Sequence, residues 1–163
     1  MPQSPDFIRE LHPGEETAVE QLLQKAFRGN DQAALVRHLR KQGDMAGEQV
    51  LPLGERIIGY YALSHMKSPK GWLCLAPVAI HPDYQGQGHG RRMIGQLTEW
   101  ARLARAHVVV LGEPGFYEKA GFSHARAARM TSPYPISHTL LAGPGEQAPE
   151  VTLTYPSAFG QSG

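Results

Sequence analysis

The spacing of apolar residues divides the chain into stretches with a helical period and stretches with strand-like runs. Apolar side chains recur every three or four positions between residues 18 and 39, and again between residues 93 and 104. Glycines interrupt the first pattern near residues 29 and 43, and two glutamates precede it, where acidic groups favour a helix start. The pattern predicts helices over about 15–27, 31–43 and 93–104.

Runs rich in β-branched and aromatic residues predict strands elsewhere. The nearly continuous apolar run over 71–80 indicates a strand covered on both faces, and 107–111 is a short branched run typical of a buried parallel strand. With the helix between them, these runs form a right-handed βαβ unit, which favours an α/β fold with three layers. Further strands are predicted near 8–11, in a hairpin over 49–53 and 57–66, and over 138–142 and 151–155.

Composition and charge indicate a single soluble domain. The 163 residues suit one domain over 1–163, with a core over about 5–127 and a loop-rich segment with strands over 128–163, where Gly and Pro concentrate. A net charge of +1 gives no electrostatic argument for a nucleic-acid or membrane partner. Cys74 is the single cysteine, which excludes an internal disulfide. With neither a signal peptide nor an apolar run of membrane length, the sequence favours the cytoplasm.

The stretch between the predicted strand and the long helix has the chemistry of a phosphate site. Three glycines alternate within residues 85–91, and glycine permits positive φ angles and lets a ligand approach the backbone. Free N–H groups at a helix start attract phosphates, and Arg91 and Arg92 add positive charge there. We therefore expect a phosphate-bearing cofactor on this loop.

Two common nucleotide motifs do not fit this loop. A P-loop places lysine and then Ser or Thr after its glycines, whereas this chain has His89-Gly90-Arg91. A dinucleotide fingerprint spaces its glycines as G-x-G-x-x-G and has an acidic residue about 20 positions later, and this chain has neither feature. A nucleoside triphosphatase and an NAD-binding protein are both disfavoured.

A second informative stretch follows the predicted strand 107–111. Pro114 suits the first turn of a short helix, and Gly121 suits its C-terminal cap. Two aromatic residues, Phe116 and Tyr117, lie between them. A short helix is therefore expected directly after the buried parallel strand.

Both stretches resemble motifs of the GCN5-related N-acetyltransferases (GNAT). Gln85-Gly86-Gln87-Gly88-His89-Gly90 is similar to the family's acetyl-CoA motif, Arg/Gln-x-x-Gly-x-Gly/Ala. About 25 residues later, Phe116-Tyr117-Glu118-Lys119-Ala120-Gly121-Phe122 is similar to its Phe-Tyr-x-x-x-Gly-Phe helix. The phrase Val-Leu-Gly-x-Pro before this helix and the tail over 155–159 look like a YhbS-type bacterial subgroup of predicted acetyltransferases. The resemblance covers about residues 5–160.

The resemblance implies a fold and a binding site. The implied fold is α/β (α+β), with a central mixed, mostly antiparallel twisted sheet, helices on both faces, and a splayed parallel strand pair that holds acetyl-CoA. The pantetheine arm would contact strand backbone, and the pyrophosphate would lie on loop N–H groups. The implied cofactor-binding residues are Val78, Ala79, Ile80, Gln85, Gly86, Gln87, Gly88, His89, Gly90, Arg91, Gly112, Pro114, Phe116, Tyr117 and Lys119.

The resemblance also implies direct transfer of an acetyl group from acetyl-CoA to a primary amine of a small molecule or protein, in a ternary complex. Tyr117 holds the position of the general acid, and a phenol with a pKa near 10 suits a thiolate leaving group. His81 and His65 are candidate bases because imidazole titrates near neutrality, with Glu113 as a third candidate and water chains as an alternative. At Cys74 a buried core thiol is favoured over a covalent acetyl-cysteine.

Expectations for partners follow from the same resemblance. The first two helices and their link would cover the acceptor, with Phe27 and Tyr134 as substrate contacts and a homodimer as the assembly. No residues have metal-ligand spacing, so no metal is expected. Two alternatives stay open: a non-catalytic module that binds or senses acyl-CoA on the same fold, and a nucleotide-binding regulatory domain.

Overall fold

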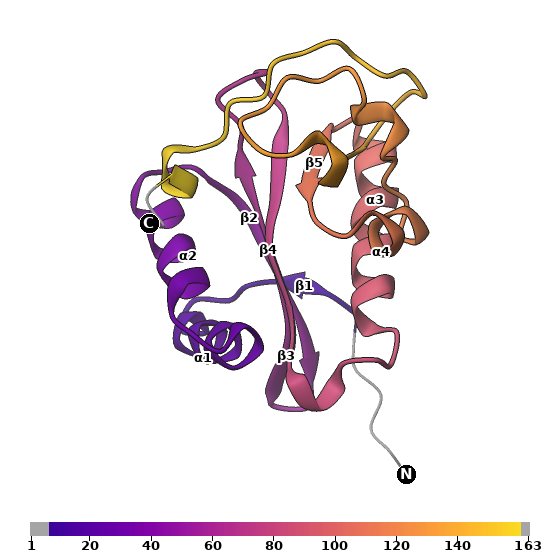
Figure 1. The fold of residues 1–163 in the computed structure, drawn as a ribbon. Helices are drawn as coiled ribbons and strands as arrows, with labels where there is room; N and C mark the ends of the chain where they lie inside the picture. The colour runs from indigo at the N-terminus through magenta and orange to yellow at the C-terminus, as the bar shows by residue number, and fades with distance from the viewer. Residues whose placement is uncertain (1–6, 161–163) are drawn as a thin grey trace.

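A six-stranded sheet with strand order β1-β2-β3-β4-β5-β6 forms the centre of the computed structural model, which describes residues 7–160 (Figure 1). The strands are β1 (Arg9–Glu10), β2 (Met45–Leu53), β3 (Arg56–His65), β4 (Leu73–Ile80), β5 (Val108–Leu111) and β6 (Thr139–Ala142). Neighbouring strands run antiparallel except β4 and β5, which run parallel. The expected mixed, mostly antiparallel sheet is confirmed.

Helices cover both faces of this sheet, because each helix has one apolar stripe. On one face lie α1 (Glu16–Phe27) and α2 (Asp31–Lys41); on the other lie α3 (His89–Ala104) and α4 (Pro114–Lys119) (Figure 1). The α3 stripe that packs on the sheet consists of Met93, Ile94, Leu97 and Ala101. The α1 and α2 residues that pack on the opposite face are Val19, Leu22, Leu23, Ala33 and Val36. Among the described residues, no helix is long and apolar enough to cross a bilayer.

The strand predicted over 151–155 does not form, and the prediction was wrong. Thr152 makes an isolated parallel bridge to Thr131, and Thr154 makes an isolated antiparallel bridge to Ser68. Because the two bridges lead to different segments in opposite directions, they cannot grow into one ladder. The apolar residues of this stretch are buried for another reason: Leu153 and Tyr155 pack in a cluster with Cys74.

Strand β2 begins at Met45, four residues before the predicted start. The early part of β2 contains Glu48, whose side chain is only 12% exposed. Its carboxylate accepts hydrogen bonds from the Tyr60 hydroxyl at 2.6 Å and from the Arg40 guanidinium at 2.7 Å. A charged residue in a buried strand position does not show in a pattern of apolar residues, so this part of the strand was missed.

The parallel strands β4 and β5 pair over only part of their length. Their register runs from Leu73 with Val108 to Leu75 with Val110, and β4 then continues to Ile80. On its other side β4 carries one extra residue between the Leu75 and Val78 pairings with β3, which marks a β-bulge. In the described part of the chain no pairing between β4 and β5 follows Leu75, so the two strands part there, before β4 ends at Ile80.

Candidate active site

The glycine loop leads from β4 into α3 through a short 3-10 turn, Pro82–Tyr84. Gly86 has φ +75° and Gly88 has φ +85°, both in the left-handed region that favours glycine. Gly88 is the N-cap of α3 and has no side chain, so the N–H groups of the first turn stay accessible. The Gln85 side-chain amide donates to the Ile80 carbonyl at 2.9 Å and ties the loop back to β4.

Gly90 is the point where the loop, β4 and α4 meet. A Cβ added there would lie 3.5 Å from Phe116 Cζ and 3.6 Å from Ile80 Cγ1. Both distances are ordinary contact, so a methyl group fits and a larger side chain collides. The structure thus brings together three of the sequence-predicted binding residues.

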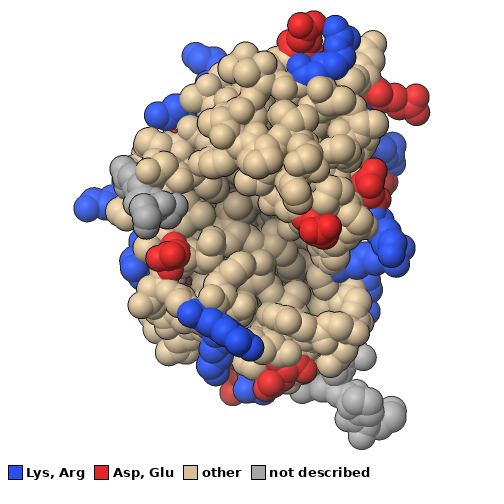
Figure 2. Space-filling view, viewed as in Figure 1, with Lys and Arg blue, Asp and Glu red and all other residues tan. Residues whose placement is uncertain are grey.

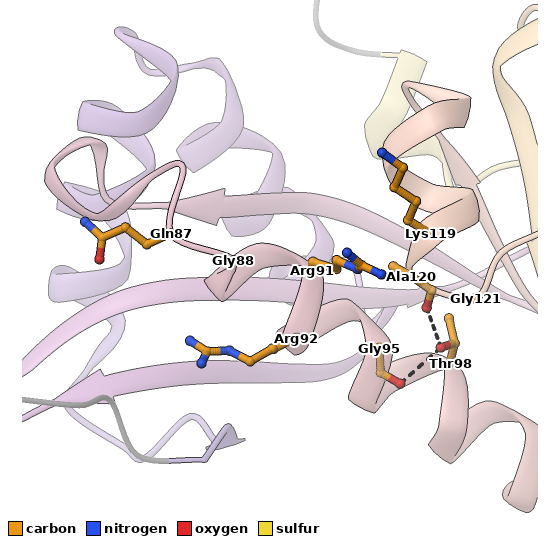
Figure 3. Close-up of a pocket in the computed structure, with 9 residues that line it drawn as sticks. All are labelled: Gln87, Gly88, Arg91, Arg92, Gly95, Thr98, Lys119, Ala120 and Gly121. Carbon is orange, nitrogen blue, oxygen red and sulfur yellow. Dashed lines mark hydrogen bonds between the residues drawn. The ribbon is translucent and has the colours of Figure 1, made fainter.

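A cavity of about 580 Å³ lies along α3 and reaches the end of α4 (Figure 3). We call it the basic groove; its lining residues are Gln87, Gly88, Arg91, Arg92, Gly95, Thr98, Lys119, Ala120 and Gly121. Within residues 7–160, none of its three cations forms an ion pair with a carboxylate. Unpaired cations that line one groove favour an anionic ligand.

Five lining residues of the basic groove were not among the predicted binding residues: Arg92, Gly95, Thr98, Ala120 and Gly121. Of these, Gly95 and Thr98 lie further along α3. They follow Arg91 at steps of four and three, so all three share one face of α3. The Thr98 hydroxyl donates to the Ala120 carbonyl at 2.7 Å and joins α3 to the end of α4. Helical spacing from Arg91 was the signal that could have identified them.

His89, the first residue of α3, is only 8% exposed. Its Nδ1 contacts the Arg92 guanidinium, one turn further along the helix. Burial, and to a smaller extent the charge of Arg92, hold the pKa of His89 below its ordinary value. The ring is therefore neutral near pH 7, and Nδ1 can accept a hydrogen bond from the guanidinium.

Tyr117 lies in α4 against the end of β5. A Cβ added at Gly112 would lie 2.5 Å from Tyr117 Cε2, so this position requires glycine. The Tyr117 ring also packs edge-on against Phe116 and Phe122, at centroid distances of 4.9 and 5.7 Å. Burial raises the pKa of Tyr117 to about 12, so the phenol is protonated near neutral pH. Within residues 7–160 its hydroxyl has no hydrogen-bond partner.

The candidate bases lie in other places. His81 Nδ1 accepts the Asp83 N–H at 3.1 Å, and the ring lines a separate cavity of about 230 Å³ beside α1. His65 is the exposed last residue of β3 and pairs with Leu73, at the opposite end of β4 from the glycine loop. Glu113 is the residue just before α4. The structure does not bring either histidine into the basic groove.

A hollow separates the half of the molecule with α1 and α2 from the half with β5 and α4, and Figure 2 shows charged groups at its rim and uncharged residues on its floor. Phe27, the last residue of α1, is 44% exposed. Tyr134 is half-buried and packs edge-on against Tyr155, with centroids 5.0 Å apart. Cys74 is buried, and burial raises the pKa of its thiol to about 12, which keeps it protonated and unreactive.

Comparison with known proteins gives one family. The family described as "Acetyltransferase (GNAT) domain" matches residues 46–124. The chain is 32% identical over 123 residues to the uncharacterized N-acetyltransferase YhbS of Escherichia coli K12. This alignment covers 72% of the chain and 74% of the relative.

Solved structures give the same fold. The chain resembles the Escherichia coli GNAT family N-acetyltransferase YhbS in complex with CoA, with a TM-score of 0.83 and 23% identity, over 100% of this chain and 96% of that one. It also resembles a GNAT family acetyltransferase from Brucella melitensis in complex with acetyl-CoA, with a TM-score of 0.79 and 24% identity, over 97% and 99% of the two chains. At these identities the likeness concerns the fold.

Proposed function

This chain belongs to the GNAT family of acetyltransferases, and we propose that it transfers an acetyl group from acetyl-CoA to a primary amine in a ternary complex. One observation carries the proposal: β4 and β5 stop pairing at Leu75 and Val110, and β4 then runs on to Ile80 before the glycine loop. An opening between parallel strands offers unpaired backbone groups to a ligand that itself contains amides, and the pantetheine arm of CoA is such a ligand.

The donor would lie along one continuous path. In β4 the backbone groups of Val78, Ala79 and Ile80 on the side of β5 would bind the pantetheine arm. The N–H groups at the start of α3 would take the pyrophosphate, because the positive end of a helix and its free donors favour an anion. The basic groove carries three further positive charges for the nucleotide end. The ligands of the two structural neighbours support this path.

Acyl transfer then needs a nucleophile, a polarised carbonyl and a proton for the leaving group. The neutral amine attacks the thioester carbon, a C–N bond forms and the C–S bond breaks. The protonated phenol of Tyr117 would give its proton to the departing sulfur, and its position beside the end of β5 supports this role. The amine loses its own proton to water, because His81 faces a separate cavity and His65 lies at the far end of β4.

The test is the release of free CoA thiol from acetyl-CoA in the presence of a panel of primary amines. We expect release that depends on the amine, with initial-rate plots that intersect, as for a ternary complex. Cys74→Ser should leave the rate unchanged, since no acetyl-cysteine forms. Tight binding of acetyl-CoA without release for any amine would contradict the proposed reaction and favour an acyl-CoA-binding module.

A further inference from the structure

The cations of the basic groove point in two directions. Figure 3 shows Arg92 extending back past Gly88, toward the N-terminal end of α3. In the same view Arg91 points the other way, toward Ala120 at the end of α4, the helix that also carries Lys119. Long helical side chains lean toward the helix N-terminus, so the course of Arg92 is ordinary, whereas Arg91 points the opposite way.

A contact with His89 adds to this ordinary direction of Arg92. The two residues lie three positions apart, on one face of α3, and the guanidinium contacts His89 Nδ1. The histidine is buried to 8% exposure and neutral, so it is a fixed acceptor. A guanidinium has five N–H donors, and one bond to histidine leaves the others for a ligand.

We infer that His89 is a positioning residue for donor binding. It holds Arg92 beside the start of α3, where the guanidinium and the backbone N–H groups bind the diphosphate of acetyl-CoA together. Arg91 and Lys119, which border the other end of the basic groove, then bind the 3′-phosphate. This inference rests on the proposed function, because it assigns the phosphates of that donor to cations of this chain.

The assignment of different cations to the diphosphate and to the 3′-phosphate follows from the charges of the ligand. A diphosphate and a 3′-phosphate are separate anionic groups, and each needs its own donors when the ligand lies along the groove. Charge-assisted hydrogen bonds are about twice as strong as neutral ones. Within residues 7–160 no carboxylate competes for the three cations. An arginine held in place loses less side-chain freedom on binding, so removal of its acceptor weakens binding without removal of the charge.

The experiment measures the dissociation constants of acetyl-CoA and of 3′-dephospho-acetyl-CoA by calorimetry. His89→Phe keeps a buried ring and removes the acceptor, and we expect it to weaken both ligands about tenfold. His89→Asn places an amide oxygen close to the position of Nδ1 and should keep affinity within about threefold of wild type. In the Arg92→Met background, His89→Phe should have no further effect, since its partner is gone.

Two further variants test the second half of the inference. Arg91→Met and Lys119→Met should weaken acetyl-CoA and leave 3′-dephospho-acetyl-CoA unchanged. The inference is overturned if His89→Phe leaves both affinities unchanged, if its effect persists without Arg92, or if it affects acetyl-CoA alone. Should His89→Phe not fold, Arg92→Met makes a second test, because it removes the guanidinium that His89 holds and should weaken both ligands; equal affinity with wild type would overturn the inference.

The same measurements separate failure of this inference from failure of the proposed function. If wild-type protein binds neither ligand, the proposed donor is wrong. If wild-type protein binds both and releases CoA with an amine, but the His89 and Arg92 variants behave as wild type, only the positioning role is wrong.

Discussion

The two sides of the sheet differ in how their surfaces are assembled from the sequence. On the side of α3, the glycine loop, β5 and α4 follow each other within residues 81–121, and Gly90 meets Phe116 and Ile80 directly. On the side of α1 and α2, distant segments meet: the Ser157 hydroxyl bonds the Gln42 side chain at 3.2 Å, and Ser68 bridges Thr154. The side of the glycine loop is thus a local construction and the side of α1 and α2 a non-local one.

This difference explains what kind of change each side tolerates. A local site depends on backbone angles within a few residues, so one substitution in the loop removes it. A non-local surface depends on many contacts between segments, so a substitution there lowers the stability of the protein or changes the shape of the surface gradually. The predictions below separate the two sides on this basis, in order of decreasing effect.

Gly88→Val should abolish donor binding. Valine disfavours the left-handed conformation that Gly88 adopts at φ +85°, and its side chain would cover the N–H groups of the first turn of α3. We expect acetyl-CoA affinity measured by calorimetry to fall by at least about 100-fold, because several hydrogen bonds to a charged group are lost together. Gly47→Ala is the matched control, since nothing lies within 4 Å of the added Cβ. Unchanged affinity in Gly88→Val would remove the loop from the donor site.

Tyr117→Phe should lower turnover about 100-fold and leave acetyl-CoA affinity unchanged, because loss of a general acid affects the chemical step. Burial raises the pKa of Tyr117 to about 12, so the wild-type rate should show no loss from this group below about pH 10. Tyr61→Phe is the control, because burial raises the pKa of Tyr61 to about 12 as well, but Tyr61 lies in β3 and not in α4. Turnover equal to that of wild type in Tyr117→Phe would contradict the role of Tyr117 as general acid.

Glu48→Gln tests the side of α1 and α2. The variant removes the negative charge to which both Arg40 and Tyr60 donate hydrogen bonds. In the wild type, burial and the charge of Glu48 raise the pKa of Tyr60, so its phenol stays protonated and acts as a donor. Because the pair is partly exposed, we expect the free energy of unfolding in urea to fall by about 2 kcal/mol. Because Glu48 contacts Arg40 and Tyr60 and is not among the residues that line the basic groove, acetyl-CoA affinity should not change.

The control for Glu48→Gln is Glu20→Gln, which breaks the more exposed Arg37 pair that joins α1 and α2. Exposed pairs contribute about 0–1 kcal/mol, so this variant should unfold close to wild type. Donor affinity that falls with Glu48→Gln as much as with Gly88→Val would mean that the two sides are not independent.

The same contrast explains what the sequence could and could not predict. The loop, α3 and the Phe116–Phe122 segment were predictable because contiguous residues carry the helical period and the turn chemistry. The prediction of a strand over 151–155 was wrong because the apolar residues of this stretch pack in a cluster with Cys74. Such long-range contacts are not encoded in a local pattern. Glu48 went unnoticed because its partners, Arg40 and Tyr60, come from other elements that the fold brings near. The His89–Arg92 contact joins residues three positions apart, so helical spacing could have indicated it.

Substitution of Glu15 should have the smallest effect on the free energy of unfolding, and this effect should depend on pH. Its carboxylate accepts two hydrogen bonds from Arg9, at 2.9 and 2.8 Å, and one from the His12 N–H, at 2.7 Å. The hydrogen bonds from Arg9 lower the pKa of Glu15 from 4.5 to about 2; burial opposes this shift, and the His12 hydrogen bond and the charge of Arg9 add to it. The folded protein therefore binds this proton less readily than the unfolded chain, so the stabilisation is complete above about pH 5 and is lost between pH 4.5 and 2.

Urea unfolding at pH 7 and at pH 3 should reveal this contribution as a difference between wild type and Glu15→Gln. At pH 7 the variant should be less stable by at most about 1 kcal/mol, because the pair is near the surface, and the difference should shrink at pH 3. Since the Arg9–Glu15 pair joins β1 to the start of α1, it acts on the non-local side, and donor affinity at pH 7 should equal that of wild type. A stability difference that grows as pH falls would reverse the sign of the linkage and show that Glu15 is not held in its charged form by Arg9.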